Sequence, residues 1–93
     1  MNEKTGPTQT DAPARREVRA MLPGTFYRKP APDQPNYKDS GDTVSVGDVL
    51  GLIEVMKTFH RVVSEHDGIL SAFLVDNEAP IKAGQVLARI EEG

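Results

Sequence analysis

The segment VSVGDVLGLIE at residues 44–54 decides the fold, because it recurs as IKAGQVLARIE at residues 81–91. A glycine, a Val-Leu pair and an Ile-Glu pair keep the same spacing in both copies. Upstream, PGTFYR at residues 23–28 aligns with DGILSA at residues 67–72. Each copy is too short to bury its own apolar face, so two similar halves should pack together about a pseudo-two-fold axis.

Short runs of strand-forming residues, separated by turn residues, make up the rest of the chain. Gly, Pro, Asp and Asn recur between these runs, and no longer stretch shows the apolar period of a helix. Turn signals at such intervals predict an all-β sandwich or barrel with little or no α-helix. The expected strands lie at residues 17–22, 25–28, 43–46, 49–55, 58–64, 69–75, 81–84 and 85–91.

The composition is that of one small domain. Among the 93 residues, apolar types make up 38% but aromatic types only 5%, so the core should consist of Val, Leu, Ile and Ala. We expect residues 17–93 to form this domain. Residues 1–16 are mostly polar or helix-breaking, and we expect them to form a disordered N-terminal tail.

Several functional classes find no support in the sequence. The net charge of −3 comes from interspersed charges without a basic patch, which argues against nucleic-acid binding. The absence of cysteine excludes disulfides and thiolate metal sites. No apolar run approaches the ~20 residues of a membrane span and no signal peptide is evident, so we expect a soluble cytoplasmic protein. His60 and His66 lack metal-binding spacing, so we interpret them as surface residues and expect no metal site.

The two halves differ in one loop. Gly24 and Val44 are 20 positions apart, whereas Gly68 and Ile81 are 13 positions apart, so the first half contains about seven additional residues. These fall within KPAPDQPN at residues 29–36. Because proline fixes φ, we expect a stiff protrusion there rather than a flexible loop.

A single lysine occupies the centre of one predicted hairpin. The strands expected at residues 49–55 and 58–64 leave only Met56 and Lys57 between them. Two-residue hairpin turns favour positive φ at both positions, which neither Met nor Lys prefers. A turn that contradicts local preference is a candidate functional site. Lys57 is then either a solubilising residue or a lysine displayed for enzymatic modification, since a catalytic lysine would require burial or a cationic neighbour.

Other polar and aromatic residues have structural interpretations. We expect Asp48, Asp67 and Asn77 to form turns, and Glu54 to face outward beside the lysine turn. No nucleophile elbow or phosphate loop is evident, so the sequence predicts no catalytic site. The aromatic residues that we expect to serve in packing are Phe26, Tyr27, Phe59 and Phe73.

These motifs resemble the biotinyl domain family. EVMK at residues 54–57 is similar to the Glu-Ala-Met-Lys-Met signature of biotinyl domains. GTFYRKPAPD at residues 24–33 resembles the biotin carboxyl carrier protein of bacterial acetyl-CoA carboxylase, and the resemblance extends from about residue 18 to residue 91. It implies a flattened β-barrel (a barrel-sandwich hybrid) of two pseudo-symmetric four-stranded halves, with residues 29–36 as a proline-rich thumb loop.

The resemblance also implies the site residues. Lys57 would carry biotin through an amide bond. Met56 and Glu54 would take part in recognition by biotin protein ligase, and Lys29 would be the thumb residue that contacts the biotin head. Because a lysine side chain cannot accept a hydrogen bond, Lys29 would contact biotin only as a donor to the ureido oxygen.

Three residues depart from the family's pattern. Val55 stands where Ala is usual, Thr58 stands where Met usually follows the lysine, and Lys29 stands where Thr is common. The first two bear on the efficiency of ligation, and the third bears on the thumb contact.

The function implied is that of a non-catalytic carrier. Its partners would be biotin protein ligase, a biotin carboxylase and a carboxyltransferase, with acetyl-CoA as the favoured acceptor. Lys57 and its biotin would form a swinging arm between the two active sites. Two alternatives stay open: a lipoyl carrier domain, although lipoyl domains resemble Asp-Lys-Ala at the tip, and an unmodified barrel that serves as an assembly module.

Overall fold

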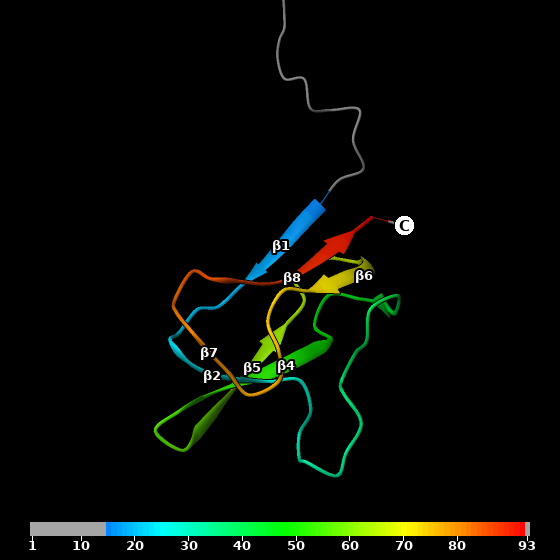
Figure 1. Ribbon diagram of the computed structural model, residues 1–93. Coiled ribbons are helices and arrows are strands. Elements are labelled where there is room, and N and C mark those ends of the chain that lie inside the picture. The colour runs from blue at the N-terminus through cyan, green and yellow to red at the C-terminus, as the bar shows by residue number, and fades with distance from the viewer. Residues whose placement is uncertain (1–14, 93) are drawn as a thin grey trace, which may run out of the picture.

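The computed structural model describes residues 15–92 and shows that this part of the chain is all-β, without a helix. Figure 1 shows the strands wrapped into one small barrel. The expectation of an all-β domain is confirmed. No helix in the described residues is long and apolar enough to cross a membrane. The strands are β1 (Arg15–Arg19), β2 (Gly24–Tyr27), β3 (Thr43–Val44), β4 (Val49–Val55), β5 (Thr58–Val63), β6 (Gly68–Phe73), β7 (Ala79–Ile81) and β8 (Val86–Glu91).

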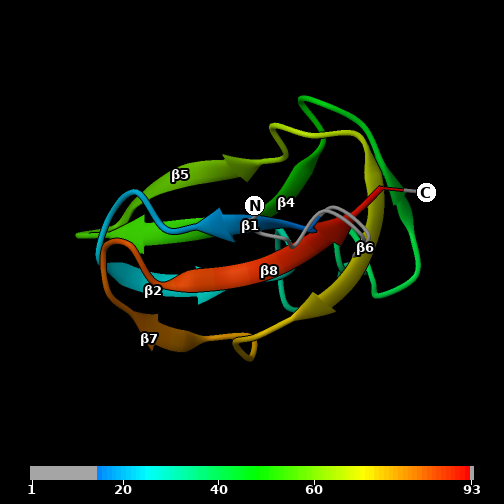
Figure 2. The ribbon, with the colours of Figure 1, turned by 90° about the horizontal axis from the view of Figure 1, so that it is seen from above.

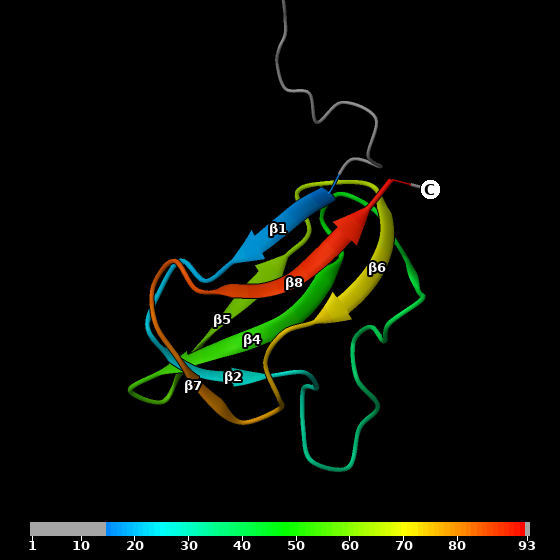
Figure 3. The ribbon, with the colours of Figure 1, turned by 45° about the horizontal axis from the view of Figure 1, so that its top comes forward.

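The strands form two four-stranded antiparallel sheets, β1-β8-β6-β3 and β5-β4-β2-β7. Figures 2 and 3 show the two sheets as facing layers. Exchanging β1–β4 for β5–β8 in order converts the strand order of one sheet into that of the other. The predicted pseudo-two-fold symmetry is therefore present in the topology, and each sheet contains strands from both halves.

The predicted start of the domain is displaced by two residues. Arg15 and Arg16 belong to β1, where they pair with Glu91 and Ile90 of β8, although the sequence placed them in the tail. An edge strand is held by backbone hydrogen bonds along one side, so it does not require an apolar pattern at its end. The rest of the predicted tail, residues 1–14, lies outside the described residues.

The core lies between the two sheets and contains side chains from both. Phe26 is fully buried, and its ring centroid lies 6.1 Å from that of Phe73. Full burial of each large apolar side chain contributes about 1.5–3 kcal/mol to folding, so this single core accounts for the stability of the barrel. Its buried members are Val18, Ala20, Phe26, Val44, Leu50, Ile53, Val62, Leu70, Ile81, Leu87, Ala88 and Ile90.

The predicted turn formers are confirmed by their hydrogen bonds. Asp48 Oδ2 accepts a bond from the Ser45 N–H at 2.9 Å and closes the turn between β3 and β4. Asp67 Oδ1 accepts one from the Val46 N–H at 2.9 Å. Asn77 Oδ1 accepts one from the Arg28 N–H at 2.8 Å and so joins the β6–β7 turn to the end of β2.

The proline segment leaves the barrel between β2 and β3, where Figure 1 shows a long projecting loop. The Tyr37 N–H donates to the Arg28 carbonyl at 2.9 Å and closes the base of the loop. The Arg28 guanidinium lies 4.2 Å from the centroid of the Phe73 ring and 3.3 Å from Asp39. These contacts fix the base of the loop to the barrel, which confirms a projecting insertion in the first half.

Candidate functional site

Lys57 lies in a two-residue turn between β4 and β5. Val55 and Thr58 are the last paired residues of the two strands, which leaves Met56 and Lys57 as the whole loop. Their φ angles are 49° and 66°, as a type I′ turn requires. Left-handed backbone costs roughly 1–2 kcal/mol for each residue other than glycine. The turn therefore retains two unfavourable residues where Asn-Gly would fit without strain.

The turn presents its side chains to solvent. Figure 1 shows the hairpin extending beyond the rest of the β5-β4-β2-β7 sheet. The Met56 side chain is 92% exposed, and Lys57 is also exposed. Within residues 15–92, the Lys57 ammonium makes no hydrogen bond or ion pair. Such an amine is accessible to a modifying enzyme, and it lacks the burial that would make it a catalytic base.

Glu54 lies on the outer face of β4, three residues before Lys57, and it is half-buried. One of its carboxylate oxygens accepts a hydrogen bond from the Tyr27 hydroxyl at 3.0 Å. This bond, with smaller contributions from burial and from the charges of Glu54 and Glu78, raises the pKa of Tyr27 above 10.0. The expected outward position of Glu54 is confirmed, and its hydrogen bond to Tyr27 is a finding that the sequence did not predict.

Phe59 lies on β5 beside Glu54, and it differs from Phe26 and Phe73, which pack in or against the core. It pairs with Glu54 across the β4–β5 ladder, and its side chain is 56% exposed. Its ring centroid lies 5.9 Å from that of Tyr27, at an interplanar angle of 57°. Phe59 therefore packs on the outside of the sheet and not in the core.

The thumb and the hairpin share one groove. A hollow of about 150 Å³ is bounded by Phe59 of the hairpin, by Lys29, Pro30 and Pro32 of the thumb, and by Glu78. Lys57 does not line this groove. The structure thus brings Lys29 near the base of the hairpin, where it shares the groove with Phe59, two positions after Lys57.

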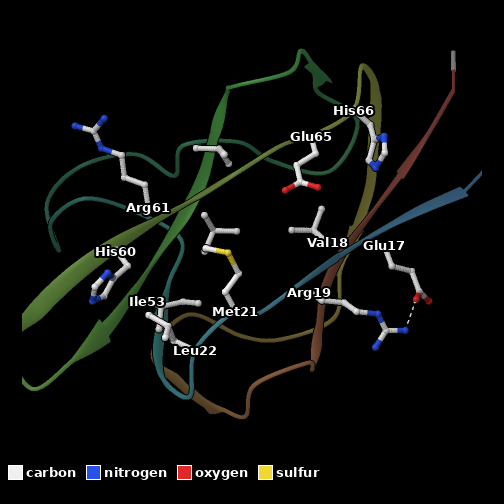
Figure 4. Close-up of a pocket in the computed structure, with 12 residues that line it drawn as sticks. Glu17, Val18, Arg19, Met21, Leu22, Ile53, His60, Arg61, Glu65 and His66 are labelled. Atoms are coloured by element: carbon white, nitrogen blue, oxygen red, sulfur yellow. Dashed lines mark hydrogen bonds and ion pairs between the residues drawn. The ribbon is translucent and has the colours of Figure 1, made fainter.

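A larger hollow of about 300 Å³ lies elsewhere, between β1 and β5 (Figure 4). Its apolar residues include Val18, Leu22 and Val62, and His60 and His66 lie on its border. Residues 54–59 do not line it, so it is separate from the lysine turn. No pattern in the sequence indicates this hollow, because it forms where edge strands from different sheets face each other. No cluster within residues 15–92 has the acidic or histidine ligands to hold a metal ion.

The departures at Val55 and Thr58 flank the turn and face each other in the ladder. Val55 is half-buried against the core, and Thr58 is exposed. Both are β-branched residues, which suit paired strand positions. They therefore fit the geometry of the hairpin.

Comparisons with known proteins identify the family of the chain. A family model described as "Biotin-requiring enzyme" matches residues 16–90. The biotin carboxyl carrier protein of acetyl-CoA carboxylase from Haemophilus influenzae is 32% identical over 87 residues, which cover 94% of this chain and 56% of the relative. The protein of that name from Streptococcus pyogenes is 40% identical over 74 residues, which cover 80% of this chain and 45% of the relative. The chain thus spans about half the length of these curated relatives.

Solved structures share the fold. The urea carboxylase of Kluyveromyces lactis matches with a TM-score of 0.69 and 25% identity, over 96% of this chain and 7% of that protein. A single-chain, multi-domain long-chain acyl-CoA carboxylase matches with a TM-score of 0.73 and 21% identity, over 88% of this chain and 7% of that protein. The flattened barrel of two four-stranded sheets is therefore that of known carboxylase domains, and the chain belongs to the biotinyl/lipoyl domain family.

Proposed function

We propose that this chain is a biotin carboxyl carrier protein, in which biotin protein ligase joins biotin to Lys57. It would serve a biotin carboxylase and a carboxyltransferase of a multi-subunit acetyl-CoA carboxylase in the cytoplasm, and would catalyse no step itself. One observation carries the proposal: Lys57 is exposed and without a partner among the described residues, in a strained two-residue turn directly after Met56. The carrier proteins to which the chain is similar support it.

The residues of the hairpin fit a covalently attached group. The Lys57 ammonium would first lose one proton, and its Nζ would then form the amide bond to the biotin carboxyl carbon, with loss of a second proton from Nζ and of the group that activates the carboxylate. When bound, biotin accepts a carboxyl group on a ring nitrogen and releases it to an acceptor. The paired strands hold the base of the arm, and the lysine stem provides its reach. Tethering of this kind gives an effective concentration in the millimolar range at each partner's active site.

Lys29 is the proposed thumb contact. It is half-buried and lines the groove that Phe59 borders at the base of the hairpin. Its ammonium can donate to the ureido oxygen of biotin but cannot accept a bond from the ureido N–H groups. Because the groove is open to solvent, we expect such a contact to be weak and sensitive to salt.

The experiment that tests this function compares wild type, Lys57→Arg and Lys82→Arg, each coexpressed with an active biotin protein ligase. We expect wild type and Lys82→Arg to gain the mass of one biotinyl group and to bind streptavidin. Lys57→Arg should gain nothing, because a guanidinium does not form the amide, and its stability should stay within about 0.5 kcal/mol of wild type. Lys82 is the matched control because it is also exposed, in the turn before β8.

Biotin on the Lys57→Arg protein would show that the attachment site is a residue other than Lys57. A wild-type protein that stays unmodified beside an active biotin protein ligase would overturn the function of a biotin carrier. A mass increase equal to a lipoyl group, after coexpression with a lipoate ligase and without biotin incorporation, would identify a lipoyl carrier instead.

A further inference from the structure

Three adjacent strands place Tyr27, Glu54 and Phe59 on one outer face of the sheet that bears Lys57. Glu54 of β4 pairs with Thr25 of β2 on one side and with Phe59 of β5 on the other. Tyr27 follows Thr25 by two residues, so it lies diagonally across from Glu54, within reach of a long side chain. Its hydroxyl donates to Glu54 at 3.0 Å, and its ring contacts that of Phe59 at 5.9 Å.

The side chains of the turn beside this cluster make no polar contact within residues 15–92. Both of its residues have positive φ, Met56 is almost fully exposed, and Lys57 makes no polar contact within the described chain. The orientation of the turn must therefore be set by the residues on its two flanks. Tyr27 is bound to both flanks, since Glu54 precedes the turn and Phe59 follows it.

We propose that Tyr27 is a positioning residue for the modification of Lys57. Its hydroxyl fixes the Glu54 carboxylate, and its ring fixes Phe59, so that a modifying enzyme meets both flanks of the turn in one arrangement. This inference rests on the proposed function. It assigns to Tyr27 no contact with biotin and no part in the chemistry.

The hydrogen bond from Tyr27 indicates that the Glu54 carboxylate is the group that would be positioned. A hydroxyl bond to an ionised carboxylate is stronger than a bond between neutral groups, so it restricts the rotamers of Glu54. It occupies one carboxylate oxygen, and the other makes no hydrogen bond to residues 15–92. That second oxygen is left to accept a bond from an N–H group of the enzyme. Without the Tyr27 hydroxyl, ordering of Glu54 would have to occur during binding, which weakens association.

The first test measures ligation kinetics with the protein as the varied substrate. Tyr27→Phe removes the hydroxyl and keeps the ring. We expect its KM to rise about 3- to 10-fold, as the loss of one hydrogen bond implies, with kcat unchanged. Tyr37→Phe is the matched control: Tyr37 is the chain's other tyrosine, and its hydroxyl makes no hydrogen bond to the described residues. It should keep the wild-type KM.

A double-mutant cycle separates positioning from a general loss of stability. If Tyr27 acts through Glu54, then Tyr27→Phe should have no further effect on KM in a Glu54→Ala background. Multiplicative effects of the two substitutions, or an unchanged KM for Tyr27→Phe, would overturn the proposal. All variants should keep the thermal midpoint of wild type to within a few degrees.

A spectroscopic test needs neither ligase nor biotin. The chain has two tyrosines and no tryptophan, so the tyrosinate absorbance of the Tyr37→Phe protein reports Tyr27 alone. We expect this tyrosine to titrate above 10.0, and its pKa to fall toward the ordinary value when Glu54 becomes Ala. A normal titration with Glu54 present would overturn the inference even if Tyr27→Phe failed to fold. Failure of the proposed function would instead appear as absence of wild-type modification, with the Tyr27 titration unaffected.

Discussion

The two halves of the barrel form the same turn with different side chains. In the first half, Asp48 Oδ2 accepts a bond from the Ser45 N–H, and the Asp48 N–H donates to the Ser45 carbonyl at 3.0 Å. In the second half, Gln85 Oε1 and the Gln85 N–H make the same two bonds with Lys82, at 2.9 and 3.1 Å. Each turn also contains a glycine with positive φ, 94° at Gly47 and 85° at Gly84. The two turns therefore share their backbone geometry, although the accepting side chain is a carboxylate in Asp48 and an amide in Gln85.

The halves diverge outside these shared turns. After β4 the first half continues into the lysine hairpin, whereas β8, the equivalent strand, ends at Glu91 next to the last described residue. The first half also carries the thumb, where the second has the short β6–β7 turn. Common elements therefore form the barrel, and the thumb, which among the described residues only the first half has, lines the groove at the base of the lysine hairpin. Changes at equivalent positions of the two halves can test this division.

The largest expected effect comes from Gly24 and Gly68. A Cβ atom on Gly24 would lie 2.3 Å from the Glu54 carbonyl oxygen, and one on Gly68 would lie 2.4 Å from that of Glu91. Because backbone must move in either case, we expect both Ala variants to lose about 3 kcal/mol of unfolding free energy. Denaturant unfolding of the two variants measures this loss.

The two glycine variants should differ in function. Gly24→Ala displaces the backbone of Glu54, so its folded fraction should be biotinylated more slowly than wild type. Gly68→Ala displaces β8 in the other sheet, so its folded fraction should be modified at the wild-type rate. Equal ligation defects in both variants would show that the lysine turn depends on the barrel as a whole.

A smaller effect is expected at equivalent positions before β3 and β7. Gly41 has a φ of 96° and Glu78 a φ of 69°, and their N–H groups donate to Leu70 and Phe26 at 2.7 and 2.6 Å. We expect Glu78→Gly to stabilise the protein by up to about 1 kcal/mol and Gly41→Glu to destabilise it by about 1–2 kcal/mol.

Thermal unfolding at neutral pH checks both values. Glu78→Ala is the control, because it removes the carboxylate and keeps the strained conformation, so it should not stabilise. A gain in Glu78→Ala as large as that in Glu78→Gly would assign the effect to charge and not to backbone conformation.

Much of the fold could be predicted because local signals determine it. The repeated Gly and Val-Leu spacing predicted the two halves. The hairpin turn contains neither of the residues that tolerate positive φ best, Gly and Asn, and this indicated Lys57 as a candidate site. The start of β1 at Arg15 could not be predicted, because its pairing with Glu91 depends on a strand at the far end of the chain. Strand β3 is shorter than expected because Ser45 enters the turn that Asp48 closes.

The surroundings of Lys57 were less predictable for a similar reason. Glu54 could be placed beside the turn, since both belong to one hairpin. Its bond to Tyr27 could not, because it requires the register between β2 and β4, which sequence spacing does not specify. The exposed position of Phe59 follows from the same register, which brings its ring to Tyr27 on the outer face of the sheet.

The thumb should contribute little to stability. A variant in which two glycines replace residues 30–36 approaches the shorter connection of the second half and keeps the bond between Tyr37 and Arg28. We expect its unfolding free energy to change by less than about 1 kcal/mol, because loop length has a weak effect on stability. A larger loss would mean that the thumb packs as part of the barrel.

NMR tests the thumb's role at the site. Comparison of apo and biotinylated wild-type protein should show chemical-shift changes in residues 29–36 as well as in the hairpin. Chemical-shift changes confined to the hairpin would mean that the thumb does not contact biotin. They would contradict the proposed contact between Lys29 and biotin.

The smallest effect concerns the charge that distinguishes Asp48 from Gln85. The bond from the Ser45 N–H, together with the Lys38 ammonium 3.4 Å away, holds the pKa of Asp48 below 3.8. A carboxyl group whose pKa is lower in the folded state stabilises the protein above its unfolded pKa, and this contribution is lost as the pH falls through the folded pKa. The Gln85 turn has no such dependence.

Between about pH 6 and pH 2, the thermal midpoint of Asp48→Asn should therefore fall less than that of wild type. Because Asn can still accept the Ser45 bond but carries no charge, the two proteins should differ mainly near neutral pH and should converge at the acidic end. Gln85→Glu should introduce the same acid-dependent loss in the second half. Parallel curves for wild type and Asp48→Asn would mean that the charge of Asp48 adds nothing to the turn beyond what a neutral acceptor provides.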